Sequence, residues 1–212
     1  MIHVYGVVDG LDEVPPIAGV EDAPLERRRV AGLDLVLSRS ATPPSAEVSR
    51  ETVLRHAQVV EALTRRSAAI LPAQLGRGFR DEDQLASAVA EQAAQLERGL
   101  ERVRGCVEFG LRATTELPPA PEADTGSAYM QARLDQVRLQ DDLVERLHEP
   151  LARLARETTL QRRGGGVTAA YLVERDEVPA FEAEAARLEH ADGVTVVCTG
   201  PWPPYSFAAG TP

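Results

Sequence analysis

Residues 198–207 read Cys-Thr-Gly-Pro-Trp-Pro-Pro-Tyr-Ser-Phe. Three prolines and three aromatic residues stand within the nine positions from Thr199 to Phe207. Because proline fixes φ and lacks an N–H, this tail is stiff and extended, and it cannot continue a central strand past Pro201. Its aromatic side chains carry a large, mostly apolar surface that must be buried against something. The tail is therefore predicted to end the last strand of the chain.

Two uses of this tail are open. The aromatic side chains can pack on the chain itself and close a domain, which is the simpler reading. They can also form a rigid arm that is presented to a partner. The candidate residues for either role are Trp202, Pro203, Pro204, Tyr205 and Phe207.

Upstream of the tail, the hydrophobic patterns alternate between strand and helix. They predict a strand, a long helix, a strand, a short helix and a strand, in that order, over residues 106–116, 127–160, 167–173, 176–188 and 193–198. This order gives most of a β-α-β-β-α-β set, with one strand missing or hidden. Residues 105–212 are therefore expected to form a modified ferredoxin-like α/β sandwich.

The long helix contains a proline at position 150. Its apolar stripe keeps its phase across that residue and comprises Met130, Leu134, Val137, Val144, Leu147, Leu151 and Leu154. Proline removes a helical hydrogen bond and crowds the preceding turn, so we expect a kinked helix or two abutting helices.

The first half of the chain predicts a separate α+β domain, residues 1–104. A buried strand is expected at residues 2–8, and one or two more are expected within 25–38, with Gly32 at a turn or a bulge. Two helices follow, at about 50–66 and from Asp81 to about 103. Their expected buried stripes are Val53, Leu54, Ala57, Val60 and Leu63 in the first, and Leu85, Val89, Ala93, Leu96, Leu100 and Val103 in the second.

Composition narrows the class of protein. The chain has 212 residues, a net charge of −10 and two cysteines. The acidic balance argues against nucleic acid or an anionic bilayer as a partner. The N-terminus lacks the basic region of a signal peptide, and no apolar run approaches the roughly 18 residues of a membrane span. A cytoplasmic protein is expected.

Motifs for chemistry are missing from the sequence. The glycines at 164–166 do not form a phosphate-binding loop, and no serine stands in a nucleophile motif. The histidines, at positions 3, 56, 148 and 190, are scattered, and the pair Glu145/His148 occurs only once, whereas di-iron bundles use such a pair twice. We therefore predict no catalytic residues, no metal and no cofactor.

Three consecutive arginines, Arg27, Arg28 and Arg29, stand out against the acidic background. They are predicted to be a solvated strand face with a neighbour in the turn. The other reading is a weak electropositive patch for an acidic partner.

The tail, taken with several motifs before it, resembles the gas vesicle GvpF/GvpL family. Besides the tail, the resemblance rests on Val4–Val8, Leu54–Ala57, Ile70–Pro72, Gly76–Phe79, Gly105–Glu108 and Ala169–Val173, in the family's order. It covers nearly the whole chain. Pro150 is the one departure from what the family's long helix leads us to expect.

This resemblance implies two α+β domains, the second modified ferredoxin-like, and an accessory or minor structural protein of gas vesicles, located at the vesicle in the cytoplasm. The implied partners are the hydrophobic shell protein GvpA and other gas vesicle accessory proteins, and the implied role is to aid nucleation of the shell or prevent aggregation of its subunit. No catalytic residue is implied. The alternative is a ferredoxin-like ligand-binding or enzymatic protein, since a fold does not fix a function.

Overall fold

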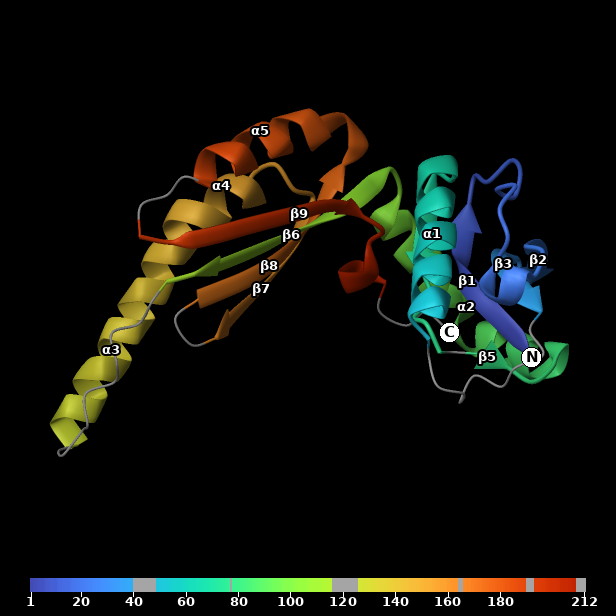
Figure 1. Cartoon of the computed structure of the whole chain (residues 1–212), viewed down its shortest axis with the longest axis horizontal. Helices are drawn as coiled ribbons and strands as arrows, with labels where there is room; N and C mark the ends of the chain where they lie inside the picture. Colours follow the sequence, from blue (N-terminus) through green and yellow to red (C-terminus); the bar gives the residue numbers. More distant parts are fainter. Residues whose placement is uncertain (40–48, 77, 116–125, 164–165, 190–192, 209–212) are drawn as a thin grey trace. The chain divides into compact units, whose positions relative to one another are not determined.

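The structure is a computed structural model that describes residues 1–39, 49–76, 78–115, 126–163, 166–189 and 193–208 (Figure 1). Its contacts divide the chain into a first unit, Met1–Val107 with the tail from Trp202 onwards, and a second unit, Glu108–Pro201. Each unit has its own sheet. The expected domains, 1–104 and 105–212, stay a prediction; the division by contacts differs from them mainly because it assigns the tail to the first unit.

The sheet of the first unit has the strand order β2-β3-β1-β4, and β5 also pairs with β1. All of these pairs are antiparallel. The strands are β1 (Ile2–Asp9), β2 (Glu26–Val30), β3 (Leu33–Arg39), β4 (Ala69–Pro72) and β5 (Gly78–Phe79). The predicted strand at 2–8 and the two strands within 25–38 are confirmed.

The turn between β2 and β3 explains the glycine at position 32. Val30 pairs with Leu33, so only two residues form the loop. Ala31 and Gly32 both have positive φ, 49° and 86°. Tight hairpins favour such a turn because its twist matches that of the strands, and glycine adopts it without steric cost.

Two helices complete the first unit: α1 (Arg50–Arg66) and α2 (Glu82–Val103). Each begins at a side-chain cap. The N–H of Thr52 donates to Ser49 Oγ at 3.1 Å, and the N–H of Gln84 donates to Asp81 Oδ1 at 2.8 Å. Such caps satisfy backbone donors that have no partner within the helix.

The buried face of α2 agrees with the prediction except at Ala93, which is only half-buried, whereas that of α1 agrees only at Val60 and Leu63. In α2 the buried residues are Leu85, Val89, Leu96, Leu100 and Val103. In α1 they are His56, Val59, Val60, Leu63 and Thr64. The prediction for Val53 and Leu54 was wrong, since they are 45% and 52% exposed. The buried face of α1 includes a histidine and a threonine, which a search for apolar spacing passes over.

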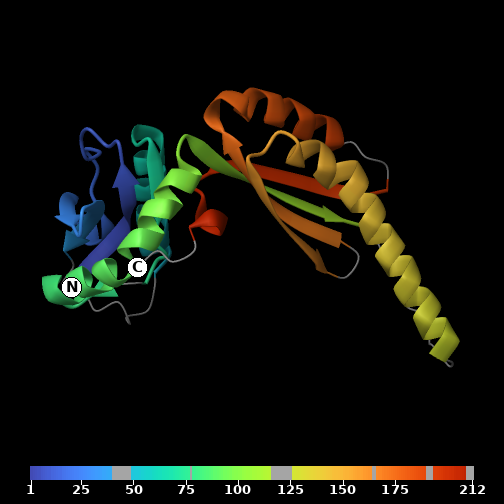
Figure 2. The ribbon, with the colours of Figure 1, turned by 180° about the vertical axis from the view of Figure 1, so that it is seen from behind.

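The sheet of the second unit has the strand order β7-β8-β6-β9. Its strands are β6 (Cys106–Thr114), β7 (Glu157–Arg163), β8 (Gly166–Glu174) and β9 (Thr195–Trp202). Helix α5 (Val178–Leu188) and the short α4 (Glu149–Ala152) lie over one face of this sheet (Figures 1 and 2). On that face the Phe181 ring packs against Phe109 and Tyr171, with ring centroids 4.6 and 5.3 Å apart.

Strand β7 is the strand that the sequence pattern hid. The predicted helix to residue 160 was wrong, since helical structure ends at Ala152. Strand β7 pairs with β8 instead: Glu157 lies opposite Leu172 at one end of the pairing, and Arg163 lies opposite Gly166 at the other. The stretch has the composition of neither a clear helix nor a clear strand, so pairing with β8 decides its structure.

Pro150 shapes the end of the long helix. The helix consists of α3 (Gly126–Leu143), a π-helical turn (Val144–His148) and α4. The N–H of Glu149 donates to the carbonyl of Val144, five residues back, instead of four. Since a proline cannot donate and its ring crowds the turn before it, the hydrogen bonds slip by one residue just ahead of Pro150.

The apolar stripe of this helix is only partly buried. Leu147 and Leu151 are buried as predicted. The prediction was wrong for Met130, Leu134 and Val137, which are 57%, 49% and 41% exposed. In Figure 1 the first turns of α3 extend past the sheet of their own unit, so the described strands of that unit do not cover this part of the stripe.

Candidate functional site

The tail is anchored to the first unit by its last aromatic residue. The Phe207 side chain is 1% exposed, and the guanidinium carbon of Arg102 on α2 lies 5.5 Å from the centre of its ring. The Arg102 guanidinium also donates to the Phe207 carbonyl at 3.4 Å. A cation over an aromatic face adds attraction to the apolar burial. Pro203 and Pro204 are buried as well.

Two aromatic residues of the same tail stay on the surface. Trp202 is 46% exposed and Tyr205 is 41% exposed. Burial of the hydroxyl, together with the nearby Glu61 carboxylate of α1, raises the pKa of Tyr205 to about 12. The Tyr205 hydroxyl is therefore protonated at neutral pH and can donate a hydrogen bond.

The helix beside Tyr205 has exposed apolar residues of its own. Leu54, Ala57 and Glu61 lie at helical spacing on one side of α1, and Glu61 is the residue close to Tyr205. Val53 and Leu54 are the exposed apolar side chains near the start of that side. We call the exposed rings of Trp202 and Tyr205 the aromatic surface.

Burial thus divides the candidate residues of the tail. Phe207, Pro203 and Pro204 pack on the first unit, as a domain-closing segment would. Trp202 and Tyr205 present large rings to solvent, as a binding arm would. The roles of all five residues stay predictions.

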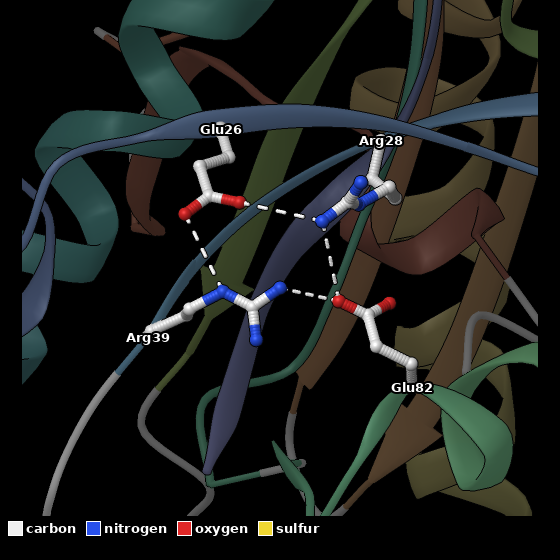
Figure 3. A network of polar contacts seen from close by, with 4 residues as sticks. All are labelled: Glu26, Arg28, Arg39 and Glu82. Carbon is white, nitrogen blue, oxygen red and sulfur yellow. Dashed lines mark hydrogen bonds and ion pairs between the residues drawn. The ribbon is translucent and has the colours of Figure 1, made fainter.

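The arginines of β2 have partners within the molecule. Arg27 donates to the Leu11 carbonyl at 2.6 Å, and Arg29 lies 3.7 Å from the Asp34 carboxylate. Arg28 joins a four-residue network with Glu26, Arg39 and Glu82 (Figure 3). The acidic-partner patch stays a prediction.

This network, shown in Figure 3, joins β2, β3 and the first turn of α2. Arg28 lies 3.9 Å from Glu26 and 3.4 Å from Glu82, and Arg39 lies 3.4 Å from Glu26 and also bonds Glu82. The two carboxylates raise the pKa of Arg39. Because all four side chains are solvent-exposed, each pair contributes little to stability, although together they hold the charges in place along β2.

A polar cluster in the first unit was missed from the sequence. His3 on β1 and His56 on α1 looked scattered, but His3 Nε2 lies 2.9 Å from His56 Nδ1. His56 Nε2 lies 3.0 Å from the Ala73 carbonyl, which only accepts, so Nε2 carries the proton and Nδ1 accepts from His3. The signal was present: His56 stands three and four residues before the buried Val59 and Val60.

Burial controls the protonation of both histidines. Burial, with a smaller contribution from His56, lowers the pKa of His3 to about 4, although Glu21 opposes the shift. Burial also lowers the pKa of His56, opposed by its hydrogen bond to Ala73. Both rings are therefore neutral at pH 7. Next to them the Tyr5 hydroxyl accepts from the Val20 N–H at 2.7 Å and bonds Ser38 Oγ at 2.9 Å.

A similar pair lies in the second unit. His148, at the end of the π-helical turn, places Nδ1 2.9 Å from the Tyr171 hydroxyl, and both residues are buried. Its sequence neighbour Glu145 is exposed, so the two do not form a joint site. His190 lies outside the described residues. Within the described part of the chain, no group of three or more histidine, cysteine, aspartate or glutamate side chains could hold a metal ion.

A hollow of about 550 Å³ in the first unit lies between the β2–β3 turn and the end of α2. Charges of both signs line it. Arg104 lies 2.5 Å from Asp9 and 2.8 Å from Glu101, and Arg29 pairs with Asp34. Arg29 and Arg104, two of the arginines that line the hollow, therefore already pair with carboxylates of the protein itself. Of the helices that the structure describes, none is both long enough and apolar enough to span a bilayer.

Known proteins with similar sequences were found by two comparisons. The family model of the gas vesicle synthesis protein GvpL/GvpF matches residues 1–209. Gas vesicle protein L of a Streptomyces species is 30% identical over 91% of this chain and 77% of its own length. Gas vesicle protein F2 of Halobacterium salinarum is 28% identical over 97% of this chain and 91% of its own.

The fold is also found in solved structures. The crystal structure of GvpF from Microcystis aeruginosa matches with a TM-score of 0.84 at 16% identity, over 98% of each chain. GvpF from an Anabaena species matches with a TM-score of 0.83 at 14% identity. The α+β fold with two antiparallel sheets and four main helices is similar to theirs. Because the family model matches nearly the whole sequence, this chain belongs to the gas vesicle synthesis protein GvpL/GvpF family.

Proposed function

We propose that this protein acts in gas vesicle formation as an accessory or minor structural protein, without enzymatic activity. It binds the hydrophobic shell protein GvpA, alongside other accessory proteins at the vesicle, and aids nucleation of the shell or prevents aggregation of free subunits. Membership in the GvpL/GvpF family supports this role. A subunit that polymerises into a shell needs its strand edges and apolar face covered beforehand.

The observation that carries the proposal is the divided tail. Phe207 and the two buried prolines fix the backbone on both sides of Tyr205, so Trp202 and Tyr205 are held in place while exposed. A partner then binds rigid rings and loses little conformational entropy in doing so. Val53 and Leu54, on α1, are further exposed apolar side chains of the first unit. The net charge of −10 keeps the protein soluble while it carries this surface.

We also propose that the second unit has a modified ferredoxin-like fold. Its elements follow the order β-α-β-β-α-β once β7 is included. Its sheet order, β7-β8-β6-β9, supports a modified ferredoxin-like fold. The long α3 with its π-helical turn is the modification.

A pull-down tests the proposal. Full-length protein is immobilised and incubated with freshly solubilised GvpA, and the retained GvpA is measured. The wild-type protein is expected to retain it, and the double variant Trp202→Ala/Tyr205→Ala is expected to retain about tenfold less, because central aromatic residues dominate binding energy. Tyr129→Ala is the matched control, since Tyr129 is 62% exposed but lies on α3.

The proposal fails if wild-type protein retains no GvpA under conditions in which shells nucleate. The assignment of the aromatic surface fails if the double variant retains as much as the wild type, or if Tyr129→Ala loses as much as the double variant. Circular dichroism of each variant shows that the fold is kept.

A further inference from the structure

The strands at the ends of the two sheets differ in charge. Strand β2, an edge of the first sheet, has four charged residues among its five. Strand β7, an edge of the second sheet, contains Glu157 and Arg162. Strand β9, the opposite edge of the second sheet, has no charged residue from Thr195 to Trp202. Charged side chains are a common way to keep a sheet edge from pairing with another chain, and β9 lacks them.

The outer side of β9 is open for pairing. Its inner side pairs with β6, and within the described residues no other strand lies next to it. Residues Thr195 to Thr199 alternate between exposed and half-buried, so the strand is accessible along this stretch. Four of the five residues from Thr195 to Thr199 are β-branched and favour strands, and from Thr195 the chain contains no proline until Pro201. This stretch can therefore accept an added strand.

The face of β9 that lies under α5 is acidic. Burial raises the pKa of the Cys198 thiol to about 11, and the nearby carboxylates of Glu189 and Glu182 add to this shift. The two glutamates are seven residues apart, so they lie on the same side of α5. Both are exposed, and among the described residues neither forms an ion pair. A strand beside β9 would thus meet uncompensated negative charge on this face.

The opposite face of β9 is small and uncharged. Val197 is 47% exposed there, and Thr199 lies on the same side, with its hydroxyl 3.2 Å from where a Cβ of Gly110 would stand. Side chains of successive residues in a strand point to opposite faces. An added strand would therefore have the glutamates of α5 near one face and small apolar or hydroxyl groups beside the other.

We propose that the free edge of β9 binds an extended segment of a partner protein as an added strand, and that this segment has basic side chains at alternate positions facing α5. Its other side chains are small or β-branched and pack beside Val197 and Thr199. Backbone hydrogen bonds supply affinity in such pairing, and the alternate side chains supply specificity. The inference does not depend on GvpA or on the aromatic surface.

A second copy of this chain fits the edge poorly. If two β9 strands paired antiparallel, the α5 faces of both copies would lie on the same side of the joined sheet. Glu182 and Glu189 of each copy would then approach those of the other. Each chain also carries a net charge of −10. Like charges brought together oppose association, so the charge pattern favours a basic partner over a homodimer.

Binding of designed peptides to the full-length chain tests this inference. The first peptide alternates arginine with threonine and valine, and the second has glutamate in place of each arginine. Fluorescence anisotropy gives their affinities, and amide hydrogen exchange locates the bound peptide. We expect the arginine peptide to bind at least about tenfold more tightly and to protect amides of β9. Equal affinity of the two peptides, or protection at β2 or β7 instead, overturns the proposal.

Substitutions locate the two recognition elements. Glu182→Gln with Glu189→Gln is expected to weaken arginine-peptide binding about three- to tenfold, whereas Glu91→Gln on α2 of the first unit changes nothing. Val197→Lys is expected to weaken it about tenfold, because it adds a guarding charge to the edge, while Val197→Thr binds normally. The proposal is contradicted if the double variant Glu182→Gln/Glu189→Gln binds the arginine peptide as tightly as the wild type. It is also contradicted if Val197→Lys and Val197→Thr lose the same amount of peptide affinity.

Two further readouts separate this inference from its alternatives. A concentration-dependent dimer that Val197→Lys abolishes, with no peptide binding, would show that β9 takes a second copy and would overturn the proposal. Loss of peptide binding in a variant that still retains GvpA through the aromatic surface would leave the proposed function intact. The two proposals can therefore fail separately.

Discussion

The edges β2 and β9 show two ways of ending a sheet. Along β2 the side chains of Arg27, Arg28 and Arg29 all have partners within the first unit. Along β9 there is no charged side chain, and the acidic groups nearby, Glu182 and Glu189, belong to α5. The first edge is guarded against pairing, and the second is left available for it.

The rest of the first unit matches the character of β2. Its tail returns and buries Phe207, and its core contains the hydrogen-bonded pair His3/His56. In our interpretation, the first unit has no free sheet edge at β2 and binds through two rigid rings, whereas the sheet of the second unit can be extended at β9. If this contrast is right, removing the buried contacts of Phe207 or of His3 should destabilise the first unit and leave the second unit unchanged.

Removing the buried ring of Phe207 is expected to have the largest effect on stability. Phe207→Ala is expected to lower the free energy of unfolding of the first unit by about 3–4 kcal/mol, because it empties a fully buried site and removes the ring beneath Arg102. Hydrogen exchange should accelerate in β1 and β3 and stay unchanged in β8. Trp202→Ala, on the exposed half of the tail, should cost less than about 1 kcal/mol.

Equal destabilisation by the two tail variants would contradict this expectation, as would faster exchange in β8. The first result would mean that Trp202 and Phe207 share one buried role. The second would mean that the two units do not unfold separately.

The tail shows what the sequence can and cannot predict. Proline chemistry predicts that the segment is stiff and that the strand does not continue past Pro201; the strand ends one residue later, at Trp202. Which ring is buried depends on the position of Arg102, more than a hundred residues away. The same holds for β7: its pairing with β8, not its own pattern, makes Glu157–Arg163 a strand. The class of fold and most elements were predictable because they rest on local periodicity.

Acidification is a milder test of the same closure. The pKa of His3 is about 4 in the folded protein and about 6.5 in the unfolded chain. Above pH 6.5 both states are neutral at His3. As pH falls from 6.5 to 4 the unfolded chain takes up the proton first, so stability is lost across this window, by about 3 kcal/mol, and little more is lost at His3 below pH 4.

Urea unfolding at several pH values between 7.5 and 4 measures this loss. His3→Gln keeps a donor toward His56 Nδ1 but does not titrate, so its stability should depend less on pH. His148 of the second unit, whose pKa is also lowered by burial, is present in both proteins, so its contribution to the pH dependence is the same in each. A pH dependence as steep in His3→Gln as in the wild type would contradict the role of His3.

The candidate site was less predictable than the fold. Trp202 and Tyr205 were named from composition, yet exposure separates them from Phe207 only in the folded chain. The histidine pair was missed because its members are 53 residues apart and meet only through the packing of α1 on β1. The acidic face of β9 was missed because its charges lie on α5, outside the strand. Each of these depends on tertiary contacts that periodicity does not contain.

Removing the guarding charges from β2 should have the smallest effect on stability and should sharpen the contrast most directly. Arg28→Thr with Arg29→Thr leaves Arg27 on the Leu11 carbonyl and makes the edge resemble β9 in composition. The free energy of unfolding should change by less than about 1 kcal/mol, since the ion pairs lost are exposed. Self-association should nevertheless increase, because a bare edge can pair with a second copy.

Sedimentation equilibrium over a range of protein concentrations measures this association, and Arg28→Lys with Arg29→Lys is the matched control that keeps both charges. Association of the threonine variant, but not of the lysine variant, would show that charge, not the shape of the side chain, guards β2. A monomeric threonine variant would mean that the geometry of the edge closes it. The absence of charge on β9 would then no longer be enough to mark that strand as open, and the binding of a basic segment there would have to rest on the acidic face of α5 alone.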